Sequence, residues 1–424
     1  MATLKEDPKQ FIEGRGKNFC RGCLSNQLFS ALDLGKLPIA NELPLNRELS
    51  SEIFPLHLRI CKSCGLGQVA DVVTPERIFR NYRYLSSMST TFLKHASDFV
   101  ADRLSENLLS PDDWVLEIGS NDGYLLKNFL IHNVKVIGVE PAENVAGIAR
   151  ELGIHTISEF FSSNLATDIL SKHGFPKLII ANNVVAHVPD LIDFINGLSI
   201  LTGPETIISI ENPSLANIVV DMQFDTIYHE HYSYLSATSL DEIGKLSDLQ
   251  LFKVEQLSIH GGSNRYWMRR VFKDKSIDDS VTKVKEFESE FKLFEEKNWL
   301  DLRKRVTTIL QDLEIWINQV HKSGGKIYGY GAAAKASTIL NSISQETSNL
   351  ILGIADLSSE KQNRFLPPVQ IEIISPDELV VAKPTDVLIF PWNIKLEIAS
   401  QLRMRLDPQV RFWCAIPKMH EVLR

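Results

Sequence analysis

Two pairs of cysteines near the N-terminus constrain the fold of this chain more than any other feature. Cys20 and Cys23 form one Cys-x-x-Cys pair, and Cys61 and Cys64 form the second. Each pair can place two thiolates on one tight turn, so two such turns provide the ligands of a closed tetrahedral site. The pattern therefore predicts one structural Zn²⁺ with no open position for catalysis. A redox dithiol and a chance pairing are the alternatives.

Composition limits the class of protein. The chain has 424 residues, 44% of them hydrophobic, which is enough for two or three domains with separate cores. No apolar run approaches the roughly 18 residues of a membrane-spanning helix, and the N-terminus lacks an apolar signal segment. We therefore expect a cytoplasmic protein without a membrane partner. The net charge of -8 argues against a nucleic-acid partner, because such binding relies on clustered Lys and Arg.

The pattern of apolar segments divides the chain into three parts of an α/β protein. Residues 1–78, rich in Gly and Pro, predict an irregular zinc-binding module whose cysteine pairs bracket a small subdomain rather than one hairpin. Strand-like and helical segments alternate over 79–275 and again over 276–424, which predicts two Rossmann-like domains. Residues 276–322 predict one long amphipathic helix or a broken pair. The expected strands are 114–118, 134–139, 177–181, 205–211, 326–331, 350–356, 387–390 and 410–415.

The turn that follows the first strand of the central part points to a cofactor. In Glu117-Ile-Gly-Ser-Asn-Asp-Gly123, Gly119 lets the backbone approach a ligand and Gly123 lets the next helix pack tightly. The following strand ends at Glu140, which is placed to accept both hydroxyls of a ribose. Because this order differs from Gly-x-Gly-x-x-Gly and suits a ligand without pyrophosphate, it favours S-adenosylmethionine (SAM) and a class I methyltransferase domain. Ordinary α/β packing is the alternative.

A second polar group lies in Tyr228-His-Glu-His231. A phenol, a carboxylate and imidazoles can together remove a proton next to a carbonyl and stabilise the oxyanion that forms. A metal site on the two imidazoles and a plain polar loop are the alternatives. His187 follows the strand at 177–181, where methyltransferases line the space between cofactor and substrate. It is predicted as a site residue, with a helix-cap or core histidine as the alternative.

These motifs together resemble the SAM-dependent nucleotide-sugar 3-C-methyltransferases of deoxysugar pathways. The matching segments extend over almost the whole chain. They are Cys20-x-x-Cys23, Leu32-Asp-Leu-Gly35, Pro38-x-Ala-Asn41, Cys61-x-x-Cys64-Gly65, Tyr82-Arg-Tyr84, Glu117-Ile-Gly-Ser-Asn-Asp-Gly123, Asn182-Asn183, Ala186-His-Val-Pro-Asp190, Tyr228-His-Glu-His231, His260-Gly-Gly-Ser263, Gly329-Tyr-Gly-Ala-Ala-Ala-Lys335 and Pro391-Trp-Asn393. The resemblance implies a zinc module over 1–78, a SAM-dependent methyltransferase domain over 79–275 and a C-terminal domain over 276–424 that helps to hold a nucleotide sugar. It also implies a monomer.

The implied reaction is methylation at C3 of an NDP-4-keto-6-deoxyhexose, through base-catalysed enolate formation and then methyl transfer. His231 is the favoured base, Tyr228 or Tyr82 donates to the enolate oxygen, and Glu230 orients an imidazole; His187 completes the site. The residues expected at the cofactor are Glu117, Gly119, Asn121, Asp122, Gly123, Glu140, Asn182 and Asn183. Those expected at the substrate are His260, Asn264, Arg265, Gly331, Lys335, Trp392 and Asn393.

One segment departs from the family pattern. After Ser263 the family carries a Leu-Arg-Val-like continuation, whereas this chain reads Asn264-Arg-Tyr-Trp267. If that segment lines the sugar pocket, Asn264 and Trp267 alter which sugar fits.

Two other functions compete with methyl transfer. The glycine turn that ends at Lys335 suits a diphosphate, but it also loosely fits a dinucleotide turn, with Asp356 after the next strand. An NAD-dependent nucleotide-sugar oxidoreductase is thus one alternative, although it leaves Glu117 and Glu140 unexplained. A non-catalytic zinc-bearing adaptor is the other, and the polar cluster around His231 argues against it.

Overall fold

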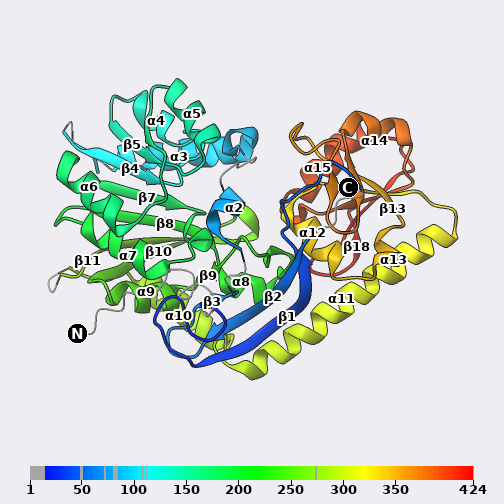
Figure 1. The fold of residues 1–424 in the computed structure, drawn as a ribbon, viewed down its shortest axis with the longest axis horizontal. Coiled ribbons are helices and arrows are strands. Elements are labelled where there is room, and N and C mark those ends of the chain that lie inside the picture. The colour runs from blue at the N-terminus through cyan, green and yellow to red at the C-terminus, as the bar shows by residue number, and fades with distance from the viewer. Residues whose placement is uncertain are drawn as a thin grey trace.

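The computed structural model describes residues 15–47, 51–70, 73–79, 85–106, 108–110, 112–272 and 275–423. In these ranges the strands form one four-stranded sheet and two seven-stranded sheets. Figure 1 shows the two larger sheets side by side, with the N-terminal strands extending between them. None of the helices in this described part has the length and apolar character needed to cross a bilayer.

A long antiparallel hairpin forms the N-terminal part. Its strands are β1 (Leu28–Pro38) and β2 (Ile53–Cys61), with Leu28 opposite Cys61 and Pro38 opposite Ile53. β3 (Gly67–Gln68) pairs with β2 and with β9 (Ser233–Tyr234) of the central part, and α2 (Pro75–Phe79) follows. The prediction of an irregular module without a single hairpin is therefore wrong. The signal that reveals β2 is the alternation of buried Leu56, Leu58 and Ile60 with more accessible residues.

The central sheet has the order β10-β11-β8-β7-β4-β5-β6. Its parallel strands are β4 (Trp114–Ile118), β5 (Lys135–Val139), β6 (His155–Ile157), β7 (Leu178–Asn182) and β8 (Ile207–Pro213), and the antiparallel hairpin β10 (Leu249–Leu257) and β11 (Ser263–Arg270) lies beside β8. Its helices are η1 (Ser86–Met88), α3 (Thr90–Ser105), α4 (Leu126–Leu130), α5 (Glu143–Glu151), α6 (Ser163–His173), η2 (Val185–His187), α7 (Leu191–Ile200), α8 (Leu215–Val220), η3 (Phe224–Thr226), α9 (Ala237–Lys245) and η4 (Ile259–Gly261).

Both faces of this sheet are buried. Adjacent residues Ile179 and Ile180 on β7 contribute to different hydrophobic cores, one on each face. A strand buried on both sides is apolar along its whole length, which explains why the four parallel strands β4, β5, β7 and β8 are recognisable in the sequence. The sequence prediction omits β6, β10 and β11.

The C-terminal sheet has the order β14-β15-β13-β12-β16-β17-β18. Its parallel strands are β12 (Ile327–Tyr330), β13 (Ile351–Ala355), β15 (Ile371–Ile374), β16 (Asp386–Ile389) and β17 (Arg411–Cys414), with β14 (Phe365–Leu366) and β18 (His420–Glu421) antiparallel at the edges. Its helices are α12 (Ala334–Asn341), α13 (Gln345–Ser348), α14 (Pro376–Ala382), η5 (Trp392–Ile394) and α15 (Lys395–Arg403).

Two helices connect the larger sheets, as the broken-pair alternative predicts. They are α10 (Asp279–Glu290) and α11 (Glu296–Lys322), and the break includes Lys292, whose φ of 49° is left-handed. In Figure 1 α11 runs alongside the hairpin, where Arg303 Nε donates to the Ala31 carbonyl at 2.8 Å. One hydrophobic core continues from Leu58 of β2 through Ile309 of α11 to the C-terminal sheet. The hairpin is thus packed onto the C-terminal part, and the domain boundaries stay a prediction.

Candidate active site and zinc centre

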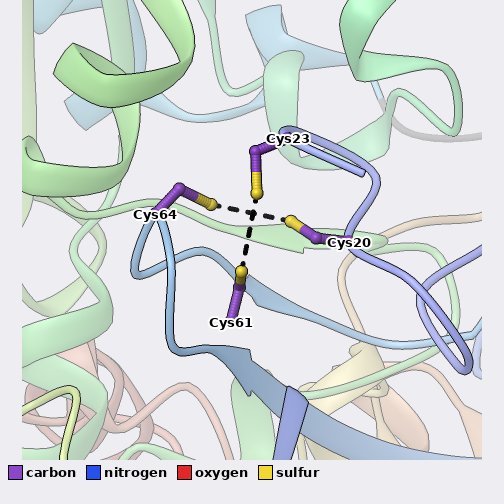
Figure 2. A group of neighbouring side chains, drawn as sticks. All are labelled: Cys20, Cys23, Cys61 and Cys64. Carbon is purple, nitrogen blue, oxygen red and sulfur yellow. Dashed lines mark hydrogen bonds between the residues drawn. The ribbon is translucent and has the colours of Figure 1, made fainter. Parts of the chain in front are cut away.

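The four paired cysteines converge on one point (Figure 2). The Sγ atoms of Cys20 and Cys64 are 3.6 Å apart, as are those of Cys23 and Cys61, and all four lie within 4.8 Å of one another. A tetrahedral site with Zn–S bonds of about 2.3 Å has sulfur–sulfur edges of about 3.8 Å. The cluster therefore has the geometry of a zinc site. Because Cys61 ends β2, the metal fixes the base of the hairpin.

The turn after β4 contains a buried carboxylate that the described residues do not satisfy. Glu117 is 1% exposed, and neither of its carboxylate oxygens has a hydrogen-bond partner in the described ranges. Burial raises the pKa of Glu117 well above its usual value, and the nearby Asp122 and Glu140 raise it further. A buried acceptor without a donor costs about 1–3 kcal/mol, so this site favours a ligand with a cationic or hydrogen-bonding group. The ammonium group of SAM meets that requirement.

Glu140, at the end of β5, is held in place by backbone amides. Its Oε1 accepts from the Ala142 N–H at 2.9 Å and its Oε2 from the Asn121 N–H at 3.1 Å. Burial raises the pKa of Glu140 despite these two bonds. Because a carboxylate oxygen accepts more than one hydrogen bond, both oxygens can still receive a ribose hydroxyl. The two backbone bonds thus fix the orientation of the carboxylate, and its contact with a ribose stays a prediction.

The remaining residues of the turn position its neighbours. Asn121 Oδ1 accepts from the Ser86 N–H at 2.9 Å, and Asp122 Oδ2 from the Ser87 N–H at 3.3 Å, so η1 is docked onto the turn. Gly119 has a φ of 68°, and a Cβ there would lie 2.4 Å from Val184 Cγ2. The close approach that requires this glycine is therefore to the loop after β7. At Gly123 a Cβ would lie 2.4 Å from Ile154 Cδ1 and 3.3 Å from Ala149 Cβ, so this glycine allows close packing against α5 rather than the expected packing of the next helix.

Asn182 and Asn183 lie at the carboxyl end of β7, beside this turn. The Asn183 N–H donates to the Glu211 carbonyl at 2.6 Å. The buried Asn182 Oδ1 and Asn183 Nδ2 atoms have no hydrogen-bond partner within the described part of the chain. Together with Glu117 they give this edge of the sheet unsatisfied donors and acceptors, which fits a polar cofactor.

Tyr228 and His231 form a hydrogen-bonded pair. His231 Nδ1 lies 3.1 Å from the Thr226 carbonyl, which can only accept, so Nδ1 carries the proton. Neutral His231 therefore has its lone pair on Nε2, which lies 2.7 Å from the Tyr228 hydroxyl. The two ring centroids are 4.0 Å apart. This arrangement can pass a proton between a phenol and an imidazole.

His187, in η2, adds a second imidazole next to this pair. Its ring centroid is 4.8 Å from that of His231, and its Nδ1–H donates to the Glu230 backbone carbonyl at 2.8 Å. Burial lowers the pKa of His187 to about 4, so it is neutral at physiological pH with the lone pair on Nε2. Since η2 follows β7, His187 connects the Tyr228–His231 pair to the edge that carries Asn182 and Asn183.

Glu230 differs from the prediction that its side chain orients an imidazole. Its carboxylate accepts from the Asn41 N–H at 3.2 Å and from Asn41 Nδ2 at 2.5 Å, whereas its backbone carbonyl orients His187. Burial raises the pKa of Glu230 to about 7. The prediction is wrong for the carboxylate because the sequence does not reveal that the hairpin connector reaches this loop.

The structure gives no support to the alternative of a metal site on two imidazoles. His229 points away from the cluster, and its Nε2 lies 3.2 Å from the Phe54 carbonyl on β2. Among the described residues, the four cysteines are the one group of three or more His, Cys, Asp or Glu side chains close enough to bind a metal. Zinc therefore belongs to the hairpin base.

Three of the residues predicted at the substrate gather at the carboxyl edge of the C-terminal sheet. Lys335 Nζ lies 3.9 Å from the centroid of the Trp392 ring and 3.3 Å from Asn393 Oδ1. Trp392 Nε1 donates to Asp225 Oδ2 at 2.8 Å, which joins this edge to η3 of the central part. A Cβ at Gly261 would lie 2.0 Å from the Trp392 indole, so the glycine of the His260-Gly-Gly-Ser263 motif is needed for this contact.

The other predicted substrate residues are placed differently. Arg265 is paired with Glu211 at 2.7 Å and with Glu255 at 3.3 Å, and Asn264 Nδ2 lies 3.3 Å from the Tyr266 hydroxyl. Both side chains already have protein partners, so their contact with substrate stays a prediction. The side chain of His260 and the whole of Tyr82 lie outside the described residues.

Trp267 and Gly331, which the sequence predicts near the substrate, both pack against other parts of the protein. Trp267 is 2% exposed and stacks on Phe99 in a hydrophobic core, so it does not line a sugar pocket. A Cβ at Gly331 would lie 2.4 Å from Pro391 Cγ, so this glycine turn packs against the chain.

Sequence reasoning missed three residues that the structure brings to the site. Asn41 contacts Glu230, Asp225 contacts Trp392, and Glu211 pairs with Arg265. The sequence does contain a signal for two of them. Glu211 is an acidic residue at the end of an apolar strand, and Asn41 ends the Pro38-x-Ala-Asn41 motif. Asp225 has no local signal, because its partner is 167 residues away in the chain.

Comparison with known proteins agrees with this geometry. Residues 20–79 match a family model described as "Putative zinc binding domain", residues 92–254 one described as "Methyltransferase domain", and residues 258–417 one described as "C-methyltransferase C-terminal domain". The C-methyltransferase NovU of Streptomyces niveus is 29% identical over 401 residues, which cover 94% of this chain and 95% of NovU.

Solved structures resemble a part of the chain. A SAM-dependent methyltransferase from Anabaena variabilis has 16% identity and a TM-score of 0.33, with 41% of this chain and 84% of that chain covered. The CcbJ methyltransferase from Streptomyces caelestis has 15% identity and a TM-score of 0.33, with 42% of this chain and 90% of that chain covered.

The fold and the acidic turn define a SAM-dependent methyltransferase with an attached zinc centre. The three family models together extend from residue 20 to residue 417, and NovU matches the chain almost from end to end. These matches support a SAM-dependent C-methyltransferase. They favour methyl transfer over the oxidoreductase and adaptor alternatives.

Removing one thiolate should remove the metal. In Cys64→Ser we expect the loss of about one zinc ion per chain and a lower unfolding temperature, because zinc binding contributes folding free energy to such a module. Elemental analysis and thermal unfolding measure both effects. Cys414→Ser is the matched control, since this buried cysteine lies outside the cluster. A folded, fully active Cys64→Ser protein without zinc would contradict the structural role.

Removing the Glu140 carboxylate should weaken cofactor binding. In Glu140→Ala we expect a loss of about 1.5–3 kcal/mol in SAM affinity, the range for hydrogen bonds to a charged group. Titration calorimetry with SAM and with S-adenosylhomocysteine measures it. Glu143→Ala is the control, because Glu143 is exposed and pairs with Arg150 at 2.6 Å. Equal affinities in the two variants would refute the role of Glu140.

Proposed function

We propose that the protein methylates C3 of a nucleotide-activated 4-keto-6-deoxyhexose, in the biosynthesis of a branched-chain deoxysugar. The observation that carries this proposal is the Tyr228–His231 hydrogen bond of 2.7 Å, next to neutral His187 at the edge of the SAM domain. A C-methyltransferase needs a carbon nucleophile, and a ketone lets a protein base create one on the neighbouring carbon. The resemblance to nucleotide-sugar 3-C-methyltransferases gives the substrate class.

The cluster supplies a base and an oxyanion donor. In the protein alone the Tyr228 hydroxyl occupies His231 Nε2. When the substrate is bound, the hydroxyl turns to the C4 ketone oxygen, and Nε2 then receives the C3 proton. Tyr228 or Tyr82 donates a hydrogen bond to the enolate oxygen as it forms. Bound SAM supplies the electrophilic methyl group, and Glu117, Glu140 and the 119–123 turn orient it.

The C-terminal edge supplies a site for the nucleotide diphosphate. Burial lowers the pKa of Lys335, while the nearby Asp225 favours its charged form. A diphosphate placed at this half-buried lysine would favour its charged form. Asn393 and Trp392 lie within reach of the same ligand, since both contact Lys335.

The family resemblance and the reduced state of the cysteines support three further proposals. We propose that the enzyme acts as a monomer, with domain boundaries at 78/79 and 275/276. We also propose a cytoplasmic location, because thiolate zinc sites persist where cysteines stay reduced.

Mass spectrometry tests the reaction directly. The enzyme is incubated with SAM labelled at the methyl group and with NDP-4-keto-6-deoxyhexoses that differ in the nucleotide base. We expect one labelled methyl group at C3 of one of these sugars, located by NMR of the product. Labelling on oxygen or nitrogen, or methylation of no 4-keto sugar, would refute the proposal.

Replacement of the base should stop proton removal without affecting the cofactor. In His231→Asn we expect kcat to fall roughly 10²- to 10⁴-fold, the usual contribution of a general base, with SAM affinity unchanged. We also expect C3 to lose solvent deuterium exchange in the presence of S-adenosylhomocysteine, since exchange needs deprotonation but no methyl donor. His321→Asn, on the exposed end of α11, is the control. Normal exchange in His231→Asn, with exchange abolished in Tyr82→Phe or His187→Asn, would place the base elsewhere.

A further inference from the structure

Asn41 directs two hydrogen-bond donors at one buried carboxylate. It lies in the connector that follows β1, and its N–H and its Nδ2 group donate to different oxygens of Glu230, at 3.2 and 2.5 Å. Glu230 is 3% exposed, whereas Asn41 is exposed. The asparagine therefore covers the carboxylate from the accessible side, and 189 residues of chain separate the two partners.

The surroundings of Glu230 make these donors important for its charge. Burial raises the pKa of Glu230 to about 7, and Glu42 raises it, while the Asn41 donors and Lys361 lower it. Two imidazoles lie close by, but burial lowers the pKa of both His187 and His229, so neither provides a counter-charge. Asn41 thus supplies the two hydrogen bonds that favour the ionised carboxylate.

The connector that carries Asn41 is fixed from two directions. On one side the hairpin holds it, and β2 also accepts the His229 hydrogen bond at the Phe54 carbonyl. On the other side the Phe365 N–H donates to the Pro44 carbonyl at 3.0 Å, and Arg364 donates to the Leu43 carbonyl at 3.3 Å. The position of Asn41 therefore depends on the zinc-anchored hairpin and on the C-terminal part together.

The same residue, Glu230, also fixes His187. Its backbone carbonyl accepts the His187 Nδ1–H at 2.8 Å, which leaves the lone pair on Nε2. The side chain and this carbonyl belong to one residue of a turn that is closed by the His231 N–H donating to the Tyr228 carbonyl at 3.0 Å, so the bonds that hold the side chain also restrain the residue that carries the carbonyl.

We propose that Asn41 is a positioning residue for the methyl-transfer reaction: its two hydrogen bonds hold the Glu230 carboxylate in place and favour its ionised form, so that the Glu230 carbonyl fixes the tautomer of His187. The zinc module thereby contributes to the active site through the connector of its hairpin. The inference rests on the proposed role of the cluster around His231 in catalysis.

Two substitutions test this role. Asn41→Ala removes the carboxamide donor, and Asn41→Asp keeps its shape but replaces the donor by an acceptor. Since Asn41 is exposed, neither change opens a cavity in the core. Asn46→Ala, at another exposed residue of the same connector, is the matched control.

We expect kcat to fall about 10- to 100-fold in both Asn41 variants, as for the loss of a hydrogen bond to a charged group, while KM for SAM and the zinc content stay unchanged. The midpoint of the acid limb of the kcat profile should move to higher pH, because the carboxylate loses a donor that favours its ionised form. Asn41→Asp should be at least as impaired as Asn41→Ala. Activity retained in Asn41→Asp would mean that only the shape of the side chain matters and would overturn the proposal.

A second measurement does not depend on the sugar substrate. NMR of protein labelled with ¹⁵N-histidine reports which ring nitrogen of each histidine carries the proton. The His187 signals are identified by their loss in His187→Asn. They should show a protonated Nδ1 and an unprotonated Nε2 in the natural protein and in Asn46→Ala. Averaging of the two tautomers in the Asn41 variants would support the proposal even if no 4-keto sugar is methylated. Unchanged His187 signals and an unchanged acid limb in both Asn41 variants would overturn it, whatever the effect on kcat.

Discussion

The hydrogen bonds that hold the 227–232 loop are the interactions on which the rest of the site depends. From the N-terminal hairpin, Asn41 and the Phe54 carbonyl bind Glu230 and His229. From the central part, His187 binds the Glu230 carbonyl. From the C-terminal part, the Thr338 hydroxyl on α12 donates to the Ile227 carbonyl at 3.0 Å. Each such bond contributes roughly 1 kcal/mol, so the loop acquires one geometry only when all three parts are in contact.

The zinc centre bears on this loop from both ends of the hairpin, because Arg21, between Cys20 and Cys23, lies 5.3 Å from the centroid of the Tyr232 ring and donates to the Pro189 carbonyl at 3.0 Å. The cysteines lie at the base of the hairpin, and Asn41 lies beyond the opposite end of β1, which has 11 residues. At about 3.3 Å per residue the strand spans roughly 36 Å. A two-stranded hairpin is marginally stable alone, so a metal at its base and α11 along its side keep it in a defined place. The four cysteines thus hold both the base of the hairpin and the turn that carries Arg21.

The parts of the site that the sequence predicts are those encoded by residues close together in the chain. The four cysteines, the 117–123 turn with Glu140, and the Tyr228–His231 pair each lie within one or two short segments. The sequence does not predict the contacts of Asn41 and Asp225, because a partner 189 or 167 residues away leaves no local pattern. The hairpin escaped prediction for another reason, since Gly and Pro residues elsewhere in 1–78 suggest an irregular module, and only Leu56, Leu58 and Ile60 of β2 show a period-two alternation.

One short helix, η3, contacts both the proposed nucleotide site near Lys335 and the proposed base His231. In η3, Asp225 accepts the Trp392 indole N–H, and the next residue, Thr226, accepts the His231 Nδ1–H through its carbonyl. Asp225 is fully buried, and burial raises its pKa to about 6. Its charge therefore depends on the hydrogen bond from Trp392 and on the nearby Lys335. If the proposed diphosphate binds at Lys335, it changes the field at Asp225, whose neighbour Thr226 carries the carbonyl that sets the tautomer of His231. Under the proposed function, η3 is therefore the element that would couple nucleotide binding to the orientation of the base.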